Sequence, residues 1–362
     1  MVIESPAAPV RALEPDALNA FVGKMLGDLG AAASAVLVII GDKLGLYREL
    51  DKAGPLSSSE LAARTATNER YVREWLANQA ASGYIDYDPA TQRFSLPPER
   101  AFMLADETSP LYIHGAFQIV EAMMAAEPQI SERFRTGRGF GWHEHDARLF
   151  EGVERFFRPG YNANLVASWI PALTGAEAKL SSGAKVADVG CGLGASTIIM
   201  AKAYPNSAFV GFDYHAGSID LARKRAQEAG VADRVSFEVA SAKDFPGSDY
   251  DLIAYFDCLH DMGDPAGAAR HVREALARDG TWMLVEPFAN DRLEENLNPV
   301  GRIFYACSTM LCTPASLSQE VGLALGAQAG EARIRTLVED AGFTHFRRAT
   351  ETPFNIVYEI KP

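Results

Sequence analysis

The feature that most constrains the fold is an alternation of short apolar runs and amphipathic helical stretches that begins at Lys185. Runs that are apolar at nearly every position are typical of parallel strands buried on both faces. The sequence therefore predicts an α/β fold with a doubly wound, mostly parallel sheet of seven strands. The helix that Asp264 and Pro265 begin is expected to end at Gly280. The expected strands are 186–189, 208–212, 235–239, 252–256, 282–285, 343–349 and 354–360, with the last two antiparallel.

Residues 41–104 follow a different pattern, in which two helical stretches precede two short strands. Ser57 and Glu60 have the spacing of a capping box, and Thr67 is expected to cap the second helix. Asp88 and the proline after it mark the turn between the strands. Helix, turn, helix and β-hairpin together predict an α-helical winged-helix domain.

Between the winged helix and the sheet lies a helical stretch, residues 105–172, that is rich in aromatic side chains. It is expected to cover an apolar pocket, although an ordinary helical core explains the same pattern. The 362 residues are therefore divided into a winged-helix domain over 1–104, this helical segment over 105–172, and a sheet domain over 173–362.

The charge balance narrows the range of partners. Lys and Arg number 34 and Asp and Glu 47, a formal net charge of −13, which disfavours binding to nucleic-acid backbones or anionic membranes. The longest apolar run, 31–40, is shorter than the roughly 20 residues of a membrane span, so we expect a buried helix and no membrane partner. No signal peptide is evident at the N-terminus. The four cysteines lack the spacing of a disulfide framework or a zinc site, so we expect the protein in the reducing cytoplasm.

A glycine-rich turn follows the first predicted strand of the sheet. It consists of Gly190, Cys191, Gly192, Leu193 and Gly194. Glycines let a ligand approach the backbone at the carboxyl end of such a strand. The spacing is GxGxG and not the GxGxxG of dinucleotide sites, and Asp188 just before the turn would repel phosphates.

Asp213 ends the second predicted strand, where an acid accepts two hydrogen bonds from a ribose diol in other doubly wound folds. Capping of the next helix is the alternative role for this residue. The glycine turn and Asp213 together indicate a nucleoside ligand without phosphate. This argues against a nicotinamide dehydrogenase, the rival enzyme class.

Over residues 185–280 these landmarks resemble the class I S-adenosylmethionine-dependent methyltransferases. The resemblance implies that S-adenosylmethionine is the cofactor and S-adenosylhomocysteine the product. It implies that the cofactor is held by Asp188 with the glycine turn, and by Asp213 with Tyr214.

The same resemblance assigns two further groups of cofactor ligands. In that family a Gly-Asp-Ala segment after the third strand often holds the adenine amine. Here Ser241 stands in place of the Asp, and Ala242 keeps its backbone amide. The fourth strand ends at Phe256 and Asp257, and it resembles the strand that lies beside the methionyl part of the cofactor.

The residues after the fourth strand are more specific. Cys258-Leu-His260-Asp261-Met262 is similar to a Leu-His-Asp-Trp segment of the small-molecule O-methyltransferases, with Met where that family often has Trp. The resemblance implies that His260 is the general base and that Glu286, at the end of the fifth strand, orients it. An imidazole titrates near neutral pH, which suits a base for a hydroxyl or phenol. A structural histidine, with Glu286 capping a loop, is the alternative.

The acceptor is expected to be small, and aromatic or bulky and apolar. Its pocket is expected between residues 140–169 and the sheet, with 288–310 contributing. His143 and His145 have the spacing of an extended HxH pair, but without a third ligand they are a weak metal signal, and no metal is expected.

The winged helix also suggests a different class of function, a DNA-binding regulator that senses the cofactor. A DNA-binding module presents a basic face, but residues 42–100 carry eight basic and nine acidic side chains, a net charge of −1. In the family that this chain resembles, the domain mediates dimerisation. We therefore expect a homodimer through the N-terminal domain, and nucleic acid is an unlikely partner.

Overall fold

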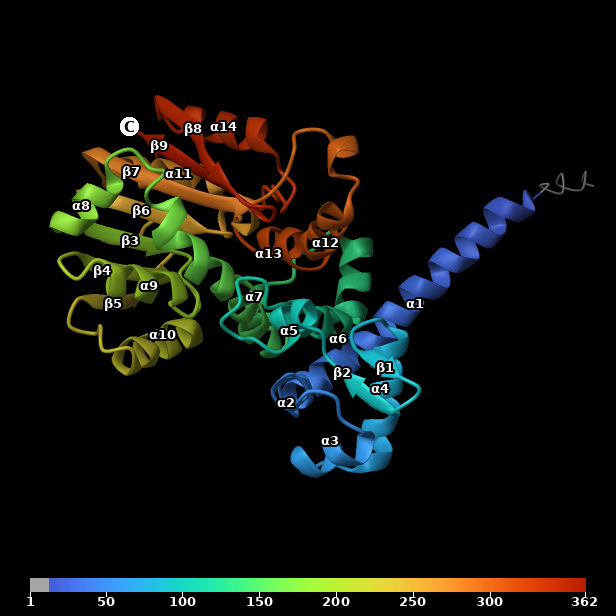
Figure 1. The fold of residues 1–362 in the computed structure, drawn as a ribbon. Coiled ribbons are helices and arrows are strands. Elements are labelled where there is room, and N and C mark those ends of the chain that lie inside the picture. The colour runs from blue at the N-terminus through green and yellow to red at the C-terminus, as the bar shows by residue number, and fades with distance from the viewer. Residues whose placement is uncertain (1–12) are drawn as a thin grey trace, which may run out of the picture. The chain divides into compact units, whose positions relative to one another are not determined.

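The computed structural model describes residues 13–362 and divides the chain into two compact units, Met1–Asp106 and Glu107–Pro362. Figure 1 shows the first unit in blue to cyan and the second in green to red.

The first unit is the predicted winged helix. Its elements are α1 (Pro15–Lys43), α2 (Leu46–Ala53), α3 (Ser58–Arg64), α4 (Glu69–Ala81), β1 (Asp86–Asp88), β2 (Arg93–Ser95) and α5 (Pro98–Leu104). The capping box of Ser57 and Glu60 is confirmed at the start of α3. The prediction that Thr67 caps α4 is wrong, because the Asn68 side chain accepts the Arg70 amide while the Thr67 hydroxyl bonds Thr65.

The core of this unit gathers around Trp75 on α4, which is 4% exposed. The Trp75 Nε1–H donates a 2.8 Å hydrogen bond to the carbonyl of Leu37 and so fixes the second half of α1 to α4. All buried residues of α1 lie between Ser34 and Asp42. The first half of α1 therefore presents its side chains outward.

The second unit contains a seven-stranded sheet in the order β5-β4-β3-β6-β7-β9-β8. Its strands are β3 (Lys185–Val189), β4 (Ala208–Asp213), β5 (Val235–Val239), β6 (Tyr250–Phe256), β7 (Leu276–Pro287), β8 (His345–Glu351) and β9 (Asn355–Lys361). The five strands from β3 to β7 are parallel, and β9 pairs antiparallel with β7 and β8. The predicted fold class is confirmed.

One predicted boundary in the sheet is wrong. The helix that begins at Pro265 ends at Ala275, not at Gly280, and β7 starts at once with Leu276. A Cβ on Gly280 would lie 2.7 Å from the carbonyl oxygen of Tyr250. The glycine is needed for close approach of β7 to β6 at an irregular register, and not to end a helix.

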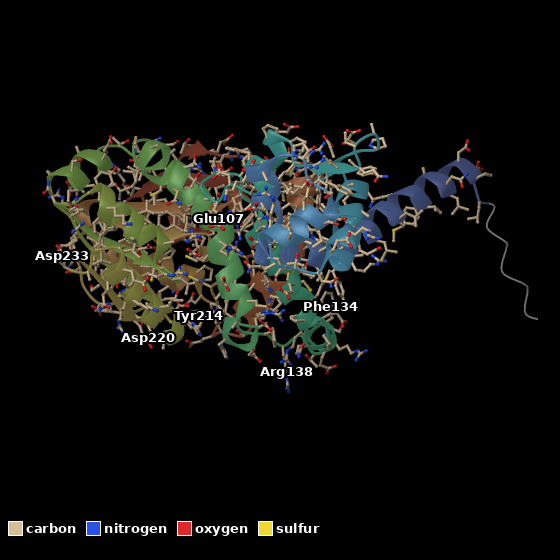
Figure 2. All side chains as sticks on the ribbon, turned by 60° about the horizontal axis from the view of Figure 1, so that its bottom comes forward. Glu107, Phe134, Arg138, Tyr214, Asp220 and Asp233 are labelled. Carbon is tan, nitrogen blue, oxygen red and sulfur yellow. The ribbon has the colours of Figure 1, made fainter. Side chains whose placement is uncertain are left out.

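Helices cover both faces of the sheet, as a doubly wound fold requires. The helices of this unit are α6 (His114–Thr136), α7 (Arg148–Asn164), α8 (Ala176–Ser182), α9 (Ala195–Ala203), α10 (Ala216–Glu228), α11 (Pro265–Ala275), α12 (Pro299–Cys307), α13 (Thr313–Leu317) and α14 (Glu331–Asp340). On one face Met200 of α9 and Ile219 of α10 share a core with the sheet, and on the other Val272 of α11 and Val338 of α14 do. Outward-facing acids of this unit, Asp220 and Asp233, are labelled in Figure 2.

A third apolar core lies among the helices and is called the helical cluster below. Its buried members are Ile119, Ala122, Leu149, Phe304, Leu311, Cys312 and Ala327. Half-buried Met123, Trp142, Val153, Phe156, Val300, Cys307, Met310 and Phe354 pack against them. These residues come from α6, α7, α12, the short helical turns η1 (Trp142–Glu144) and η5 (Ser308–Cys312), and the loops near them. The helical character expected for 105–172 is present in α6, α7 and the turn η2 (Leu165–Trp169).

Candidate active site

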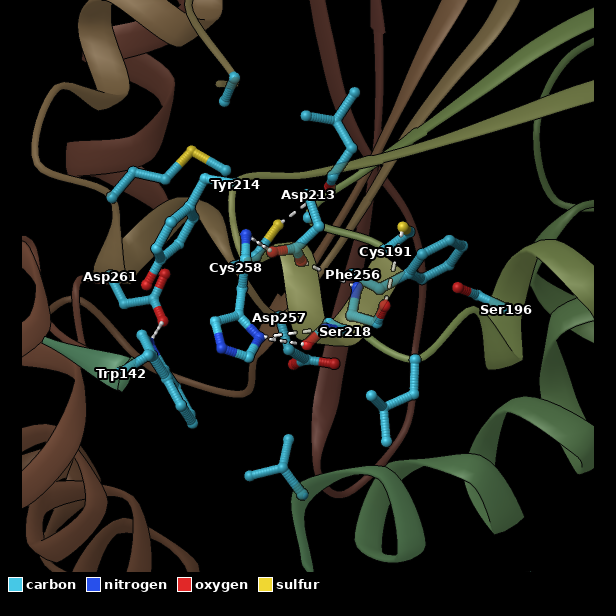
Figure 3. A pocket seen from close by; sticks show the side chains of 18 of the residues that line it. Trp142, Cys191, Ser196, Asp213, Tyr214, Ser218, Phe256, Asp257, Cys258 and Asp261 are labelled. Atoms are coloured by element: carbon cyan, nitrogen blue, oxygen red, sulfur yellow. Dashed lines mark hydrogen bonds between the residues drawn. The ribbon is translucent and has the colours of Figure 1, made fainter. Parts of the chain in front are cut away.

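A cavity of about 470 Å³ lies at the carboxyl ends of β3 to β6 (Figure 3). Most of the predicted cofactor ligands line it: Gly190, Cys191, Gly192, Asp213, Tyr214, Ser241, Ala242, Phe256 and Asp257. The ends of parallel strands meet at one edge of a sheet, which is why residues so distant in sequence converge here.

Two predicted ligands lie behind this lining. Asp188 is 1% exposed, and its Oδ2 accepts hydrogen bonds of 2.6 Å from the hydroxyls of Ser196 and Thr197. Burial raises the pKa of Asp188 to about 6. Gly194 has a φ of +80°, and a Cβ there would lie 2.7 Å from the ring of Phe237. Both residues shape the glycine turn, and contact of either with a ligand stays a prediction.

The turn itself requires glycine at Gly190. Its φ is +75°, and a Cβ there would lie 2.7 Å from the Sγ of Cys258. The turn is held from the side by Asp213, whose Oδ2 accepts the Gly192 amide at 2.9 Å while Oδ1 accepts the His215 amide at 2.8 Å. A carboxylate has about four lone-pair sites, so Asp213 keeps capacity for two hydroxyl donors in the cavity.

Half-buried acids dominate the electrostatics of the cavity. Asp257 has a φ of +53°, and its carboxylate accepts hydrogen bonds from Tyr161 at 3.1 Å and from Asn355 at 2.7 Å. Burial and the neighbouring Glu286 raise the pKa of Asp257 to about 8. Burial also raises the pKa of Asp261 to about 6 and shifts that of Asp213 upward. Upward shifts of this kind mean that the cavity can gain free energy by taking up a cation.

Positive side chains do not balance these acids. Among the described residues that line the cavity, Lys243 is the only lysine or arginine, and its Nζ lies 2.8 Å from the carboxylate of Glu320. A pyrophosphate would therefore face several acids and one engaged cation. The lining fits a nucleoside that carries positive charge and no phosphate.

His260 and Glu286 meet as the sequence predicts, at the ends of β6 and β7. Nδ1 of the imidazole lies 2.7 Å from Glu286 Oε2, while Oε1 accepts the Leu259 amide at 3.0 Å. His260 is 5% exposed and Glu286 2% exposed. Burial opposes the charged imidazole, but the Glu286 carboxylate and the Cys312 thiol within hydrogen-bonding reach outweigh it, and the pKa of His260 is raised. Neither His260 nor Glu286 lines the cavity.

Sequence reasoning missed three partners of the cavity acids. Tyr161 and Asn355 hold Asp257, and the Trp142 Nε1–H donates a 2.8 Å hydrogen bond to Asp261 Oδ2 (Figure 3). The aromatic content of the segment before the sheet was a signal for Tyr161 and Trp142. Nothing in the sequence pointed to Asn355, which lies in the last strand.

The HxH pair does not form a joint site. His143 is exposed on η1, whereas His145 is 8% exposed and packs edge-on against Phe140 at a ring distance of 4.5 Å. Burial lowers the pKa of His145 to about 4. The two imidazoles therefore face different surroundings.

Comparisons with known proteins agree with this geometry. Residues 180–342 match a family described as a methyltransferase domain, and residues 32–106 match an Rv2258c-like winged HTH domain. The 27-O-demethylrifamycin SV methyltransferase of Amycolatopsis mediterranei is 30% identical over 146 residues, which are 40% of this chain and 48% of that protein. The chain spans 24% to 48% of the length of the first curated relatives that it matches.

Solved structures resemble nearly the whole chain. A structure of the mitomycin 7-O-methyltransferase MmcR has a TM-score of 0.66 at 21% identity and covers 96% of this chain and 100% of its own. Human N-acetylserotonin methyltransferase in complex with SAM has a TM-score of 0.65 at 15% identity, over 98% of this chain and 99% of its own. The chain therefore has the fold of these solved structures, with a match to a methyltransferase domain over residues 180–342 and to an Rv2258c-like winged HTH domain over residues 32–106.

Proposed function

We propose that this protein transfers a methyl group from S-adenosylmethionine to a small aromatic or bulky apolar acceptor, with O-methylation favoured and His260 as general base. The observation that carries the proposal is the buried hydrogen bond between His260 and Glu286 beside an acid-lined cavity. S-adenosylmethionine supplies a methyl group already activated on a sulfonium, so the protein's task is to align, to exclude water and to move a proton.

The residues of the cavity suit this cofactor. The glycine turn offers backbone atoms without side chains, and Asp213 has lone pairs left for a ribose diol. Ser241 and Ala242 would face the adenine, and Phe256 and Asp257 the methionyl end. The excess of buried acids favours a ligand that carries a sulfonium and an ammonium group.

His260 has the geometry of an oriented base. Glu286 holds Nδ1 at 2.7 Å, so an acceptor hydroxyl would give its proton to Nε2 and would take the place of the Cys312 thiol there. The same carboxylate stabilises the imidazolium that forms, as an orienting acid does in other enzymes. A base of this kind contributes roughly 10²–10⁴-fold to the rate.

We further propose a homodimer formed through α1. The exposed residues Leu18, Val22, Met25, Leu29 and Val36 follow spacings of three, four and seven along this helix. Such a stripe is the seam of a two-helix coiled coil, and the same stripe on a second copy is its complement. Met25→Glu should yield monomers in light scattering, whereas Leu221→Glu on α10 should not. A dimer that survives Met25→Glu with Leu29→Glu would contradict this interface.

The cytoplasm is the location that we propose, because all four cysteines are free thiols. Among residues 13–362, α1 is long and apolar enough to cross a membrane by composition, and a third of its most apolar window is buried. We attribute this composition to the core of the first unit and to dimerisation.

A regulator that reads DNA and senses the cofactor is the alternative function. The exposed arginines of α4 speak against it, because Arg70 pairs with Glu74 and Arg73 with Glu69 on the same helix. Neutralised arginines do not provide the phosphate contacts of a DNA-binding face. A DNA probe that shifts at low salt and not at high salt would support the regulator.

Binding of S-adenosylhomocysteine tests the cofactor assignment. The product should raise the unfolding temperature of the wild-type protein, and NAD should not, because only a ligand of the folded state stabilises it. A higher unfolding temperature with NAD would overturn the proposed function. An unfolding temperature that neither ligand raises at millimolar concentration would also overturn it.

A further inference from the structure

Two neighbouring compartments of the second unit share one wall. The cavity is lined by the strand ends and their acids, whereas the helical cluster is built from aliphatic, aromatic and sulfur side chains. Only Trp142 and Val153 belong to both sets of described residues. These two side chains therefore separate the cavity from the cluster.

Trp142 is the larger of the two. Its indole N–H bonds the carboxylate of Asp261, the residue that follows His260, at 2.8 Å (Figure 3). The backbone before it packs closely, since a Cβ on Gly139 would lie 1.9 Å from the backbone nitrogen of Ser318, and the Gly141 amide donates to Glu144 at 2.7 Å. The side chain is half-buried and not fixed on all sides. The hydrogen bond to Asp261 and ring contacts to Phe150 and His145, at centroid distances of 6.1 and 6.4 Å, hold the indole where the two compartments meet.

His260 lies on the side of the helical cluster. It does not line the cavity, and Cys312, a buried member of the helical cluster, is its neighbour there. An acceptor must reach both the base and the cofactor cavity. Trp142 lines the cavity, packs in the same cluster as Cys312 and bonds Asp261, the residue next to His260.

The helical cluster also indicates what the acceptor is made of. Its members Leu149, Phe156 and Phe304 offer only apolar surface, while Met123 and Met310 are flexible and can be displaced by a guest. The thiols of Cys307 and Cys312 and the indole N–H of Trp142 are the polar groups that its members carry. A ligand that enters here must be apolar over most of its surface, with its hydroxyl at the end nearest His260.

We propose that Trp142 is the specificity-determining wall of the acceptor site. An apolar acceptor with one terminal hydroxyl occupies the helical cluster, and the indole leaves Asp261 when that acceptor meets the cavity. The proposal rests on the proposed methyl transfer and adds the position of the acceptor site and the residue that controls access to it.

The four cysteines allow a test that does not depend on activity. Cys191 and Cys258 line the cavity, whereas Cys307 and Cys312 lie in the helical cluster. The purified full-length protein is treated with iodoacetamide, and the alkylation rate of each cysteine is followed by peptide mass spectrometry. In Trp142→Ala the rate at Cys312 should rise by at least about tenfold, since a buried thiol reacts only through open conformations.

Two further variants make the result specific. Trp142→Phe keeps the ring and loses the N–H, so Cys312 should react at an intermediate rate. Tyr214→Ala removes another aromatic side chain of the cavity, one outside the helical cluster, and should leave the Cys312 rate at the wild-type value. Circular dichroism and the unfolding temperature establish that each variant is folded.

Added S-adenosylhomocysteine distinguishes the route and separates the two proposals. It should slow alkylation of Cys191 in every protein and of Cys312 in Trp142→Ala, because the reagent then passes through the cavity. An unchanged rate of Cys312 alkylation in folded Trp142→Ala and Trp142→Phe would overturn the proposal that Trp142 separates the two compartments. Faster alkylation of Cys312 in Trp142→Ala, in a protein that does not bind S-adenosylhomocysteine, would support the role of Trp142 and overturn the cofactor assignment.

Discussion

The cavity and the helical cluster lie side by side and differ in the polarity of the side chains that form them. The cavity holds the half-buried Asp213, Asp257 and Asp261 at a cost in free energy, which a cationic ligand can recover. The helical cluster is built from aliphatic, aromatic and sulfur side chains, and its Cys312 lies within hydrogen-bonding reach of His260. We expect the cofactor in the acid-lined cavity and the acceptor in the apolar cluster.

The largest expected effect is on the side of the helical cluster. His260→Ala should lower kcat by roughly 10²–10⁴-fold, because it removes the proton acceptor from the hydroxyl. The Kd of S-adenosylhomocysteine should stay unchanged, since His260 does not line the cavity. Turnover would be measured with a panel of phenols, with the exposed His143→Ala as matched control. Full turnover in His260→Ala would show that the histidine is structural.

The cavity side gives the next largest effect. Asp213→Ala should weaken S-adenosylhomocysteine binding by about tenfold to a hundredfold, the range expected for hydrogen bonds to a charged group. Titration calorimetry measures this, and Asp220→Ala on the outer face of α10 serves as control. Equal affinity of Asp213→Ala and the wild type would remove the ribose contact from the proposal.

The pH dependence of binding gives a smaller effect with a definite sign. Asp261 ionises near pH 6 and Asp257 near pH 8 in the absence of ligand, so the cavity gains negative charge as the pH rises. From pH 6 to pH 8.5, affinity for S-adenosylmethionine should therefore improve up to about tenfold relative to its uncharged-sulfur product. Competition titrations at each pH give this ratio, and a ratio that falls with pH would contradict the acid-lined cavity as a cation site.

The variant Asp257→Asn tests the role of this acid through the pH dependence of the free energy of unfolding. In the wild type the folded state keeps a proton on Asp257 up to about pH 8, while the unfolded chain releases it near pH 4. The free energy of unfolding therefore decreases with rising pH across that window. Asp257→Asn should reduce this decrease and flatten the binding ratio, as urea unfolding at pH 5, 7 and 9 would show. An unchanged pH dependence would mean that Asp257 is not the responsible group.

The smallest effect is expected at the rim of the cavity. Lys243 and Glu320 form an ion pair in which the glutamate is largely exposed. Exposed pairs contribute little, so Lys243→Ala should change S-adenosylhomocysteine affinity by less than about fivefold. A larger loss in calorimetry would mean that Lys243 contacts the ligand directly.

The sheet was predictable because its signals are local. Apolar runs, the glycine turn and Asp213 each depend on a few consecutive residues, and the structure places them as expected. The pairing of His260 with Glu286 was predictable from the family that the sequence resembles, since both follow the ends of adjacent strands.

The contacts that connect distant segments were not predictable. Trp142 and Asp261 are 119 positions apart, and no periodicity links them. The same holds for the position of Asp188 and Gly194 behind the cavity lining, because the Asp188 side chain bonds Ser196 and Thr197 and Gly194 lies against the ring of Phe237. The helix end expected at Gly280 was wrong. The sequence alone does not distinguish a glycine that permits close contact between strands from a glycine that ends a helix.

The hydrogen bond from Asn355 to Asp257 has a consequence for the order of events on the ribosome. The glycine turn, Asp213 and Asp257 itself are all translated before residue 355, yet Asp257 receives this anchor only when β9 emerges. A nascent chain that has not reached this strand can pair the five parallel strands but lacks one of the two side chains that bond Asp257, since Tyr161 is present and Asn355 is not. Stalled translation intermediates should therefore bind the ligand more weakly until the C-terminal hairpin has left the exit tunnel.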